Sequence, residues 1–301
     1  MSKEKGRRVK ILITGATGLL GSELAQHWQR HDTTVAAPSS VELDVSSADS
    51  VRRAVRAFSP DVIINCAVII SIDRCEAEPD LAWAVNRDGV MNLLEAAREF
   101  PAPPLFIQVS SSEVFGRWNG GFAINGYREY DEPKPDTVYQ KSKTEAERMV
   151  AEFAAKHPES LSRWYVIRAS WLYGEGRPTF VEQFAEALRA RQELTIAEDQ
   201  WRNPTWTRDF AASLDALIAN REPSGIYHIA NEVAPGEATV MDVIEEIRSY
   251  YAIPKEAIRL KPVHLHAFFK IPRAPSNVLL NTKLPRMRPW REALKEYLSL
   301  R

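Results

Sequence analysis

Short apolar runs rich in β-branched residues alternate along the chain with longer amphipathic segments. Six runs are typical of strands: VKILIT, TTVAAP, DVIINC, LFIQVS, WYVIRAS and GIYHIAN. The helical spacing of apolar residues appears between them in LGSELAQHWQRH, SADSVRRAVRAF, DLAWAVNRDGVMNLLEAAREF and TVYQKSKTEAERMVAEFAAKH. Strands that are apolar throughout and separated by helices predict a parallel sheet covered on both faces. The predicted fold class is therefore α/β with a doubly wound parallel sheet.

The alternation loosens after about residue 172, where prolines separate shorter elements. We therefore predict a Rossmann domain over residues 1–172 and a smaller C-terminal substrate-binding lobe over 173–301. The late run GIYHIAN has the character of a sheet strand, so residues of about 208–232 are expected to return to the first sheet. The two parts are then interleaved along the chain. In such folds ligands bind at the carboxyl ends of the strands.

A glycine pattern follows the first predicted strand directly and opens a helix. Gly15, Gly18 and Gly21 in TGATGLLG give the spacing GxxGxxG. Glycine lets the backbone approach a pyrophosphate, and a helix N-terminus supplies N–H donors and positive potential. The pattern predicts an NAD(P) site, with Asp44 after the second strand as an acceptor for the adenine amino group. Asp44 could instead cap a helix, although Ser46 or Ser47 suits that role better.

Composition narrows the classes of function. Lys and Arg number 39 against 40 Asp and Glu, a formal charge of −1, so no basic field favours nucleic acid. The longest apolar stretch, VIINCAVII, is far too short to span a membrane, and the basic start KEKGRRVK lacks the apolar stretch of a signal peptide. Two cysteines are too few for a disulfide scaffold or a zinc site. We expect a cytoplasmic protein with no metal ligands among its site residues, and the sequence does not indicate whether a metal is used structurally.

Two further motifs carry chemistry. VSSSEVFG places Ser110, Ser111, Ser112 and Glu113 at the end of the fourth predicted strand, where a turn alone would also explain serines. YQKSK places Tyr139 and Lys143 four residues apart on a predicted helix, so both side chains project from one face. An ammonium group beside a phenol favours the phenolate, so we expect Lys143 to lower the pKa of Tyr139.

Together TGATGLLG, the strand-end serines and YQKSK resemble the extended short-chain dehydrogenase/reductases. Within that group the chain is most similar to the dTDP-4-dehydrorhamnose reductase family. The segments that carry this resemblance run almost end to end: NCAVIISIDRCEAEPDLAWAVN, YQKSKTEAE, RASWLYGEG, DQWRNPTWTRDFA, GIYHIAN and RAPSNVLLNTKL. It implies an NAD(P)H-dependent reduction of the 4-keto group of a nucleotide-linked 6-deoxy sugar.

The resemblance also implies roles for individual residues. Ser111 would polarise the substrate carbonyl, Tyr139 would protonate the developing alkoxide, and Lys143 would bind the nicotinamide ribose. The cofactor would contact Gly15, Thr17, Gly18, Leu19, Leu20, Gly21, Ser39, Asp44, Val45, Cys66, Ala67, Val68, Asn86, Tyr139 and Lys143, with Asn65 beside them. Trp171 would pack on the sugar unless it is a core aromatic. Arg208 would contact nucleotide phosphate unless it is a surface arginine.

The chain departs from this family at the substrate end. The rhamnose reductases tend to read S-T-D-Y-V-F where this chain has Ser110-Ser111-Ser112-Glu113-Val114-Phe115. They also favour an aromatic residue and a threonine at the positions of Ile69 and Ile70. We expect Ser112 and Glu113 to contact the substrate, with Glu113 orienting it, although Glu113 could also be a solvated carboxylate. The identity of the sugar stays open.

Two other functions stay open as well. One is a 4,6-dehydratase or epimerase, because related dehydratases carry T-D-E or T-S-E where this chain has Ser111-Ser112-Glu113. Enzymes of this kind keep NAD bound. The same fold includes the non-catalytic NADP-binding regulatory subunit of the methionine adenosyltransferase beta type, but Tyr139 and Lys143 are both retained here. Ser39 and Ser40 follow the second strand without an adjoining carboxylate or arginine, and this favours NADP(H) over NAD(H). The sequence does not indicate the oligomeric state, and a homodimer is compatible with it.

Overall fold

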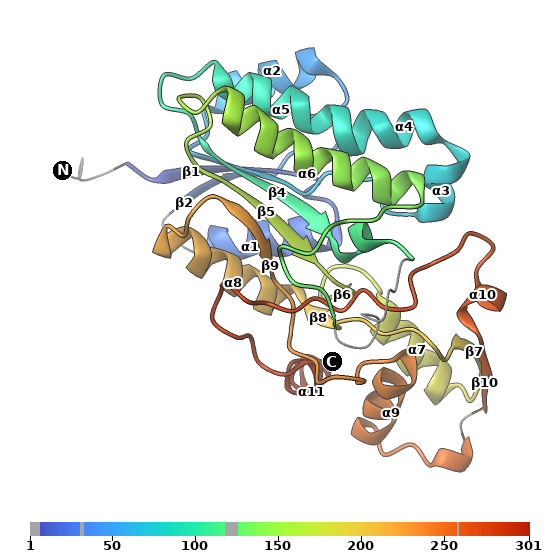
Figure 1. Cartoon of the computed structure of the whole chain (residues 1–301). Coiled ribbons are helices and arrows are strands. Elements are labelled where there is room, and N and C mark those ends of the chain that lie inside the picture. The colour runs from blue at the N-terminus through green and yellow to red at the C-terminus, as the bar shows by residue number, and fades with distance from the viewer. Residues whose placement is uncertain (1–6, 31–32, 118–125, 258) are drawn as a thin grey trace.

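The computed structural model describes residues 7–30, 33–117, 126–257 and 259–301, and a parallel six-stranded sheet lies at its centre (Figure 1). In spatial order the strands are β2 (Thr33–Ala36), β1 (Val9–Thr14), β3 (Val62–Asn65), β4 (Leu105–Ser111), β5 (Trp164–Ala169) and β9 (Gly225–His228). Every neighbouring pair is parallel, and Ile11 of β1 stands between Val35 and Val62. These are the six runs that the sequence pattern predicts as strands.

Helices cover both faces of the sheet (Figure 1). On one face lie α1 (Leu19–Gln29) and α8 (Thr207–Asn220), and on the other lie α2 (Ala48–Phe58), α5 (Gly89–Arg98) and α6 (Val138–Lys156). The predicted fold class, a doubly wound parallel sheet, is confirmed. The chain adds β2 on one side of β1, and then β3, β4, β5 and β9 on the other side. The switch point of the sheet is therefore the crevice between the carboxyl ends of β1 and β3.

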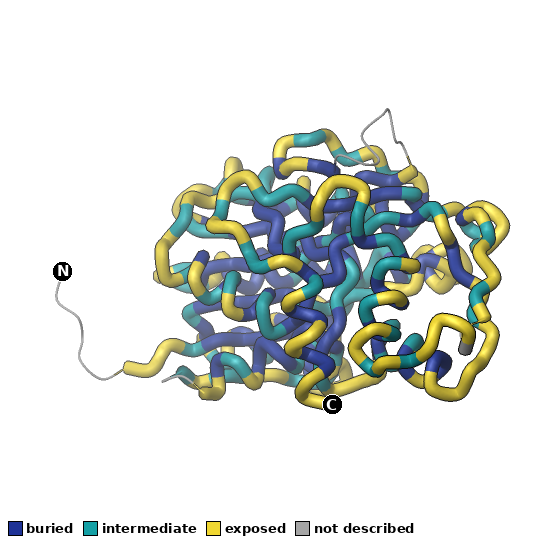
Figure 2. The backbone as a smooth tube through the Cα atoms, turned by 90° about the horizontal axis from the view of Figure 1, so that it is seen from below, coloured by how far each residue is buried: buried dark blue, intermediate teal, exposed yellow. Residues whose placement is uncertain are grey.

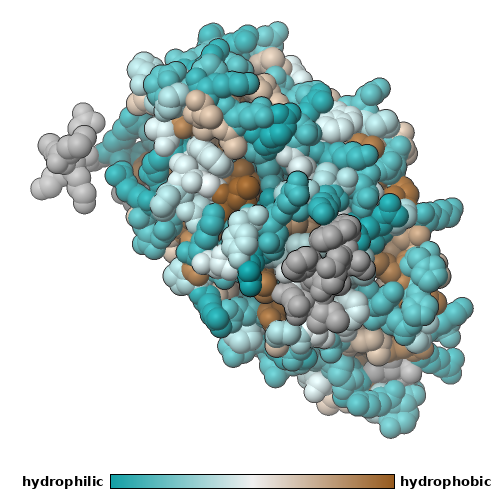
Figure 3. Space-filling model, viewed as in Figure 1, coloured by the Kyte–Doolittle hydropathy of each residue, from teal (hydrophilic) through white to brown (hydrophobic). Residues whose placement is uncertain are grey.

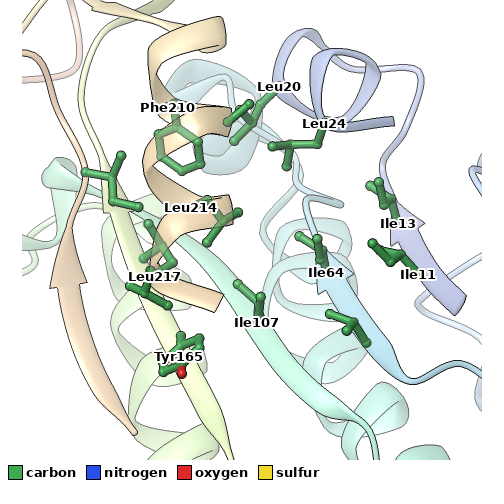
Figure 4. Close-up of a cluster of buried hydrophobic side chains, with 14 of the residues drawn as sticks. Ile11, Ile13, Leu20, Leu24, Ile64, Ile107, Tyr165, Phe210, Leu214 and Leu217 are labelled. Carbon is green, nitrogen blue, oxygen red and sulfur yellow. The ribbon is translucent and has the colours of Figure 1, made fainter. Parts of the chain in front are cut away.

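Alternate residues of each strand enter the two apolar layers. Ile11 and Ile13 of β1 belong to the same apolar cluster as Leu24 of α1 and Phe210 of α8 (Figure 4). Leu12 belongs to the cluster on the opposite face of the sheet. Burying an Ile or Leu side chain contributes about 1.5–3 kcal/mol, so both layers stabilise the sheet. The tube in Figure 2 shows buried segments gathered in the interior and exposed segments around them.

The long helical pattern predicted over residues 80–100 is interrupted in the structure. It is preceded by α3 (Ile72–Ala77) and divides into α4 (Pro79–Trp83), a π-turn (Ala84–Asp88) and α5. The amide of Asn86, buried in the π-turn, explains this geometry: its Oδ1 accepts a hydrogen bond from the Ile69 N–H at 2.8 Å, and its Nδ2 donates to the Ile69 carbonyl at 3.1 Å. Asn86 thereby fixes the loop that follows β3.

The C-terminal lobe is built from short elements around its own core. Two small parallel sheets pair β7 (Glu193–Ala197) with β10 (Arg259–Val263), and β6 (Leu172–Tyr173) with β8 (Thr205–Trp206). Its helices are α7 (Phe180–Arg189), α9 (Val240–Tyr250), α10 (Leu265–Phe268) and α11 (Trp290–Ser299). A 3₁₀ turn of the lobe lies at Lys255–Ala257, and another follows β4 of the large sheet at Ser112–Phe115. The aromatic side chains of Tyr173, Trp206, Trp290 and Tyr297 fill the lobe's interior.

On the face shown in Figure 3, hydrophobic residues form small separate patches among hydrophilic ones. Within the described ranges, no helix combines the length and the apolar character needed to cross a membrane. After the β6–β8 pair the chain enters α8 and then β9, which adds to the edge of the large sheet beside β5. The small lobe therefore lies next to the carboxyl ends of the sheet strands (Figure 1).

Candidate active site

The turn after β1 contacts the turn after β3 at the switch point of the sheet. Gly15 has a φ of +64°, and a Cβ placed on it would lie 2.6 Å from the carbonyl carbon of Cys66. A Cβ on Gly21 would lie 2.4 Å from the Gly15 carbonyl oxygen. Both glycines are therefore required by the fold of the turn itself. At Gly18 the nearest atom to an added Cβ is the Gly15 oxygen at 3.1 Å, so this position is less constrained by the protein.

The N-terminus of α1 is open toward this turn. Gly18 occupies the N-cap position, where it has no side chain to accept a hydrogen bond, and no acidic residue stands in the first turn. The first N–H groups of a helix lack partners within it and carry positive partial charge. This arrangement fits a phosphate group, as the glycine spacing predicts.

A single cavity of about 940 Å³ joins the glycine turn to the small lobe. Most of the predicted cofactor residues line it: Gly15, Thr17, Gly18, Leu19, Leu20, Gly21, Asp44, Val45, Cys66, Ala67, Val68, Tyr139 and Lys143. Ser111, Ser112, Glu113 and Trp171 line it as well. Residues far apart in the sequence are thus brought to one site at the carboxyl ends of β1, β3 and β4.

Three of the predicted site residues lie outside the cavity lining: Ser39, Asn86 and Arg208. Asn86 binds Ile69 in the loop after β3 and also donates to the Ser142 hydroxyl at 3.1 Å. It therefore positions a loop that lines the cavity without lining the cavity itself. The Arg208 guanidinium pairs with Glu175 at 2.9 Å and lies over the Trp206 ring. Asn65 is fully buried, and its Oδ1 accepts from Thr14 Oγ1 at 2.5 Å and from the Ala67 N–H at 3.2 Å.

The turn after β2 contains a carboxylate that the sequence pattern did not reveal. Ser39 donates from its N–H and from its hydroxyl to Glu42 Oε2, at 2.8 and 2.9 Å. These two hydrogen bonds lower the pKa of Glu42. Asp44 is an exposed residue of the cavity lining, and its Oδ1 accepts from the Ser46 N–H and hydroxyl. The N-cap of α2 is Ser47, one of the two serines expected there.

Tyr139 lies in the first turn of α6, which begins with a capping box formed by Thr137 and Gln140. The Tyr139 side chain is buried in the cavity wall and is hydrogen-bonded to Ser111. Burial raises the pKa of the Tyr139 phenol well above its usual value, the hydrogen bond to Ser111 lowers it in part, and the nearby Glu113 raises it further. The phenol therefore keeps its proton near neutral pH.

The structure corrects the expectation that Lys143 lowers the pKa of Tyr139. The Lys143 Nζ donates to the Val109 carbonyl at 2.7 Å, which directs it toward β4, and Lys143 is not among the groups that shift the pKa of Tyr139. Burial lowers the pKa of Lys143 itself to about 8, although Glu147 acts in the opposite direction. For both Tyr139 and Lys143, burial in the cavity wall is the largest cause of the pKa shift, and it favours the uncharged form of each side chain.

Glu113 is held on both carboxylate oxygens. Its Oε1 forms an ion pair with Arg202 Nη1 at 2.9 Å and accepts a hydrogen bond from Asn277 Nδ2 at 2.8 Å. Its Oε2 accepts a hydrogen bond from Gln140 Nε2 at 3.1 Å. Its backbone N–H donates to Ser111 Oγ at 3.2 Å. Glu113 is thus a partly buried, structured carboxylate of the cavity wall, and not a solvated surface group.

Several cavity residues were not predicted as site residues, among them Arg177, Phe180, Gln200, Arg202 and Arg273. Trp171, with a φ of 37°, stacks on Phe180 at a centroid distance of 4.1 Å. Gln200 and Arg202 stand in DQWRNPTWTRDFA, one of the segments that carry the resemblance to the reductases. Among the residues that the structure describes, no three His, Cys, Asp or Glu side chains are grouped so that they could hold a metal ion.

The glycine turn at the switch point, the Tyr139–Lys143 pair on α6 and the serine at the end of β4 define the class. The protein is an NAD(P)-dependent oxidoreductase of the extended short-chain dehydrogenase/reductase type. The family described as "RmlD substrate binding domain" matches residues 9–300, and the chain belongs to this family. The resemblance to the dTDP-4-dehydrorhamnose reductases is confirmed.

Individual relatives extend over nearly the whole chain. A dTDP-4-dehydrorhamnose reductase of Streptomyces griseus is 33% identical over 299 residues, covering 96% of this chain and 93% of its own length. The crystal structure of dTDP-4-dehydrorhamnose reductase from Bacillus anthracis in complex with NADP is 25% identical, has a TM-score of 0.86, and covers 98% of this chain and 100% of that one. The Clostridium acetobutylicum reductase structure is 30% identical, with a TM-score of 0.84 and coverages of 97% and 99%.

Proposed function

We propose that this protein reduces the 4-keto group of a nucleotide-linked 6-deoxy sugar, with NADPH as hydride donor. The observation that carries the proposal is the pairing of Ser111 with the protonated, buried Tyr139 in the same cavity as the glycine turn. A bound nicotinamide would supply a hydride to the sugar C4. Ser111 and Tyr139 would bind and protonate the oxygen of the same carbonyl group.

The protein's part of the reaction is to stabilise and protonate that oxygen. The Ser111 hydroxyl donates a hydrogen bond as negative charge develops there. The Tyr139 phenol, whose pKa is raised by burial, transfers its proton to the oxygen and completes the alcohol. Solvent returns the proton to Tyr139 in the next cycle. In each reaction C4 gains one hydride, the carbonyl oxygen gains one proton, and one NADPH is oxidised to NADP⁺.

Lys143 serves as a binding residue in this proposal. Its ammonium group is fixed by the Val109 carbonyl at the end of β4, inside the cavity that also contains Tyr139. From that position we propose that it donates to the ribose of the nicotinamide nucleotide. The phosphates would bind the N-terminus of α1, which no side chain caps.

NADPH is the proposed cofactor. The Bacillus anthracis reductase structure, similar over the whole chain, contains NADP. The turn after β2 offers the N–H and hydroxyl of Ser39 as donors, but both are bound to Glu42. A 2′-phosphate that uses these donors must displace the Glu42 carboxylate.

The substrate contacts that we propose come from Ser112, Glu113, Trp171 and Arg208. Trp171 offers an aromatic face stacked on Phe180, a surface suited to a sugar ring. Arg208 reaches substrate only if its pair with Glu175 opens. The ion pair with Arg202 and the two hydrogen bonds to the Glu113 carboxylate favour a positioning role and disfavour its use as the base of a dehydratase.

We place the enzyme in the cytoplasm, because Cys66 and Cys75 are both free thiols and such cysteines are typical of reducing compartments. The proposed partner is the nucleotide-sugar substrate. Light scattering on the purified protein would measure whether it works as a monomer or a homodimer.

The experiment that tests the function offers several nucleotide-linked 4-keto-6-deoxy sugars with NADPH and follows nicotinamide absorbance. We expect steady oxidation of NADPH that depends on the keto sugar. A parallel reaction contains nucleotide-linked hexoses that have not been dehydrated, together with catalytic NAD. Accumulation of 4-keto-6-deoxy product there at ordinary enzymatic rates, with no reductase activity, would overturn the proposal in favour of a dehydratase.

A further inference from the structure

Glu113, Arg202 and Asn277 form a closed ring of interactions in the wall of the cavity. Arg202 Nη1 lies 2.9 Å from Glu113 Oε1 and also donates to Asn277 Oδ1. Asn277 Nδ2 donates to the same Glu113 oxygen at 2.8 Å. The Arg202 side chain is 11% exposed and that of Glu113 is 15% exposed, so the pair is largely withdrawn from solvent. Both residues line the cavity.

The ring joins the small lobe to the reacting groups. Arg202 follows β7, and its backbone N–H binds the Ala238 carbonyl of the lobe. Glu113 lies two residues after Ser111 and donates its N–H to the Ser111 hydroxyl. Gln140, the neighbour of Tyr139 on α6, donates to the other Glu113 oxygen. A ligand group that contacts this pair is therefore close to the ketone, and not at the distant phosphate end of the substrate.

The charges of the cavity arginines point to the kind of ligand group. Arg202 is neutralised by Glu113, and Arg273 is neutralised by Asp73 at 2.7 Å. Arg177 is exposed and has no ion pair with a residue of the described ranges. A neutralised pair is a poor site for an anion but offers N–H donors beside carboxylate acceptors. A carboxylate has about four acceptor positions, and the guanidinium has five N–H donors, so both retain capacity. That combination matches a hydroxyl group, which donates and accepts.

We propose that the Glu113–Arg202 pair binds the hydroxyl group next to the ketone of the sugar, and that it restricts the substrates to 4-keto sugars that retain this hydroxyl at C3. The inference rests on the proposed function and specifies its substrate class. Sugars that are deoxygenated at C3 leave the pair without its ligand, and are therefore poor substrates.

The expected size of the effect follows from hydrogen bonds to charged groups. Each contributes about 1.5–3 kcal/mol, which corresponds to roughly 10- to 150-fold in kcat/KM. A site built to bind a hydroxyl discriminates strongly against the analogue that lacks it. We therefore expect the wild-type protein to prefer the 3-hydroxy substrate over its 3-deoxy analogue by roughly 10- to 150-fold.

The test combines two changes, separately and together: removal of the 3-hydroxyl group from the substrate, and removal of the Arg202 guanidinium from the protein. kcat/KM is measured with NADPH for a nucleotide-linked 4-keto-6-deoxyhexose and its 3-deoxy analogue, in wild type, Arg202→Met, Arg202→Lys and Glu113→Gln. The exposed Arg148→Met on α6 is the matched control, since Arg148 pairs only at the surface with Glu145 and Glu152. Affinity for NADPH, measured by fluorescence titration, reports whether each variant keeps a folded cofactor site.

In the expected result, Arg202→Met removes most of the preference for the 3-hydroxy substrate and raises its KM. Arg202→Lys keeps part of the preference, the control keeps all of it, and NADPH affinity is unchanged throughout. If Arg202→Met lowers activity equally on both substrates, the pair has only a structural role and the inference is overturned. It is overturned equally if the wild type reduces both sugars alike. Failure of the wild type to reduce any keto sugar would instead refute the proposed function.

Discussion

The ammonium group of Lys143 lies 2.7 Å from the carbonyl oxygen of Val109, to which it donates a hydrogen bond. One residue on the catalytic helix is thereby tied to the strand that ends in Ser111. Because this lysine is buried, its pKa falls to about 8. That shift has a measurable consequence for stability.

Between pH 8 and the ordinary pKa of lysine, the unfolded chain binds more protons at Lys143 than the folded protein does. Stability therefore rises with pH in this window. From pH 7.5 to 9.5 we expect wild type to gain about 2 kcal/mol in the free energy of unfolding relative to Lys143→Met. Urea denaturation of both proteins at the two pH values measures the difference between their free energies of unfolding. Groups that titrate identically in both proteins do not contribute to this difference. A constant difference would show that the pKa of Lys143 is not lowered.

The second prediction separates two roles of glycine in the turn after β1. At Gly21 an added Cβ would lie 2.4 Å from the Gly15 oxygen, so Gly21→Ala should destabilise the protein. At Gly18 the protein itself leaves more room, so Gly18→Val should keep the fold and obstruct the approach of the pyrophosphate. Calorimetric titration with NADPH and thermal unfolding measure both properties. Unchanged NADPH affinity in Gly18→Val would refute the placement of the phosphates.

The third prediction concerns the turn after β2, where Ser39 binds Glu42 through two hydrogen bonds. Removing the charge of Glu42 removes its repulsion of a 2′-phosphate and weakens its hold on the Ser39 donors. Glu42→Gln should therefore raise the affinity for NADPH by roughly two- to five-fold, the range of an exposed charge interaction, with NADH affinity unchanged. Dissociation constants for both cofactors, at low and at high salt, provide the measurement. An equal change for NADH would place the 2′-phosphate elsewhere.

The fourth prediction is that Tyr139 delivers the proton to the carbonyl oxygen. General acid catalysis typically contributes 10²–10⁴-fold, so Tyr139→Phe should lower kcat by about that factor. NADPH affinity should change little, because the phenyl ring keeps the packing of the buried phenol. Steady-state kinetics together with NADPH titration give both quantities. Near-normal turnover in Tyr139→Phe would mean that another group protonates the alkoxide.

The sequence pattern identified the elements of the large sheet because their burial follows simple rules. β3, β4 and β5 and the last four residues of β1 are mostly buried, and a strand buried on both faces appears as an apolar run. The strands β6, β7, β8 and β10 were missed. β6 and β8 have only two residues each, β10 has no buried residue, and β7 has a polar, partly exposed first half, so no apolar run marks them.

The candidate site was predictable where its residues are close in sequence or follow strand ends. Tyr139 and Lys143 share a helix face, and the glycine spacing marks the turn after β1. The partners of Glu113 could not be found in this way, since Asn277 lies 164 positions away and Arg202 stands in the other lobe. The protonation of Tyr139 also depended on burial, which the i, i+4 spacing does not reveal.

Isotope transfer from the cofactor to the product shows whether a hydride reaches the ketone carbon of the sugar. The protein is incubated with a nucleotide-linked 4-keto-6-deoxy sugar and NADPH deuterated at the transferable position of nicotinamide C4. Mass spectrometry and NMR of the sugar product then locate the label. We expect a 4-hydroxy product with one deuterium, bound to C4 of the sugar. Product that carries no deuterium at C4, or a keto sugar that is recovered unreduced while NADPH remains, would contradict it.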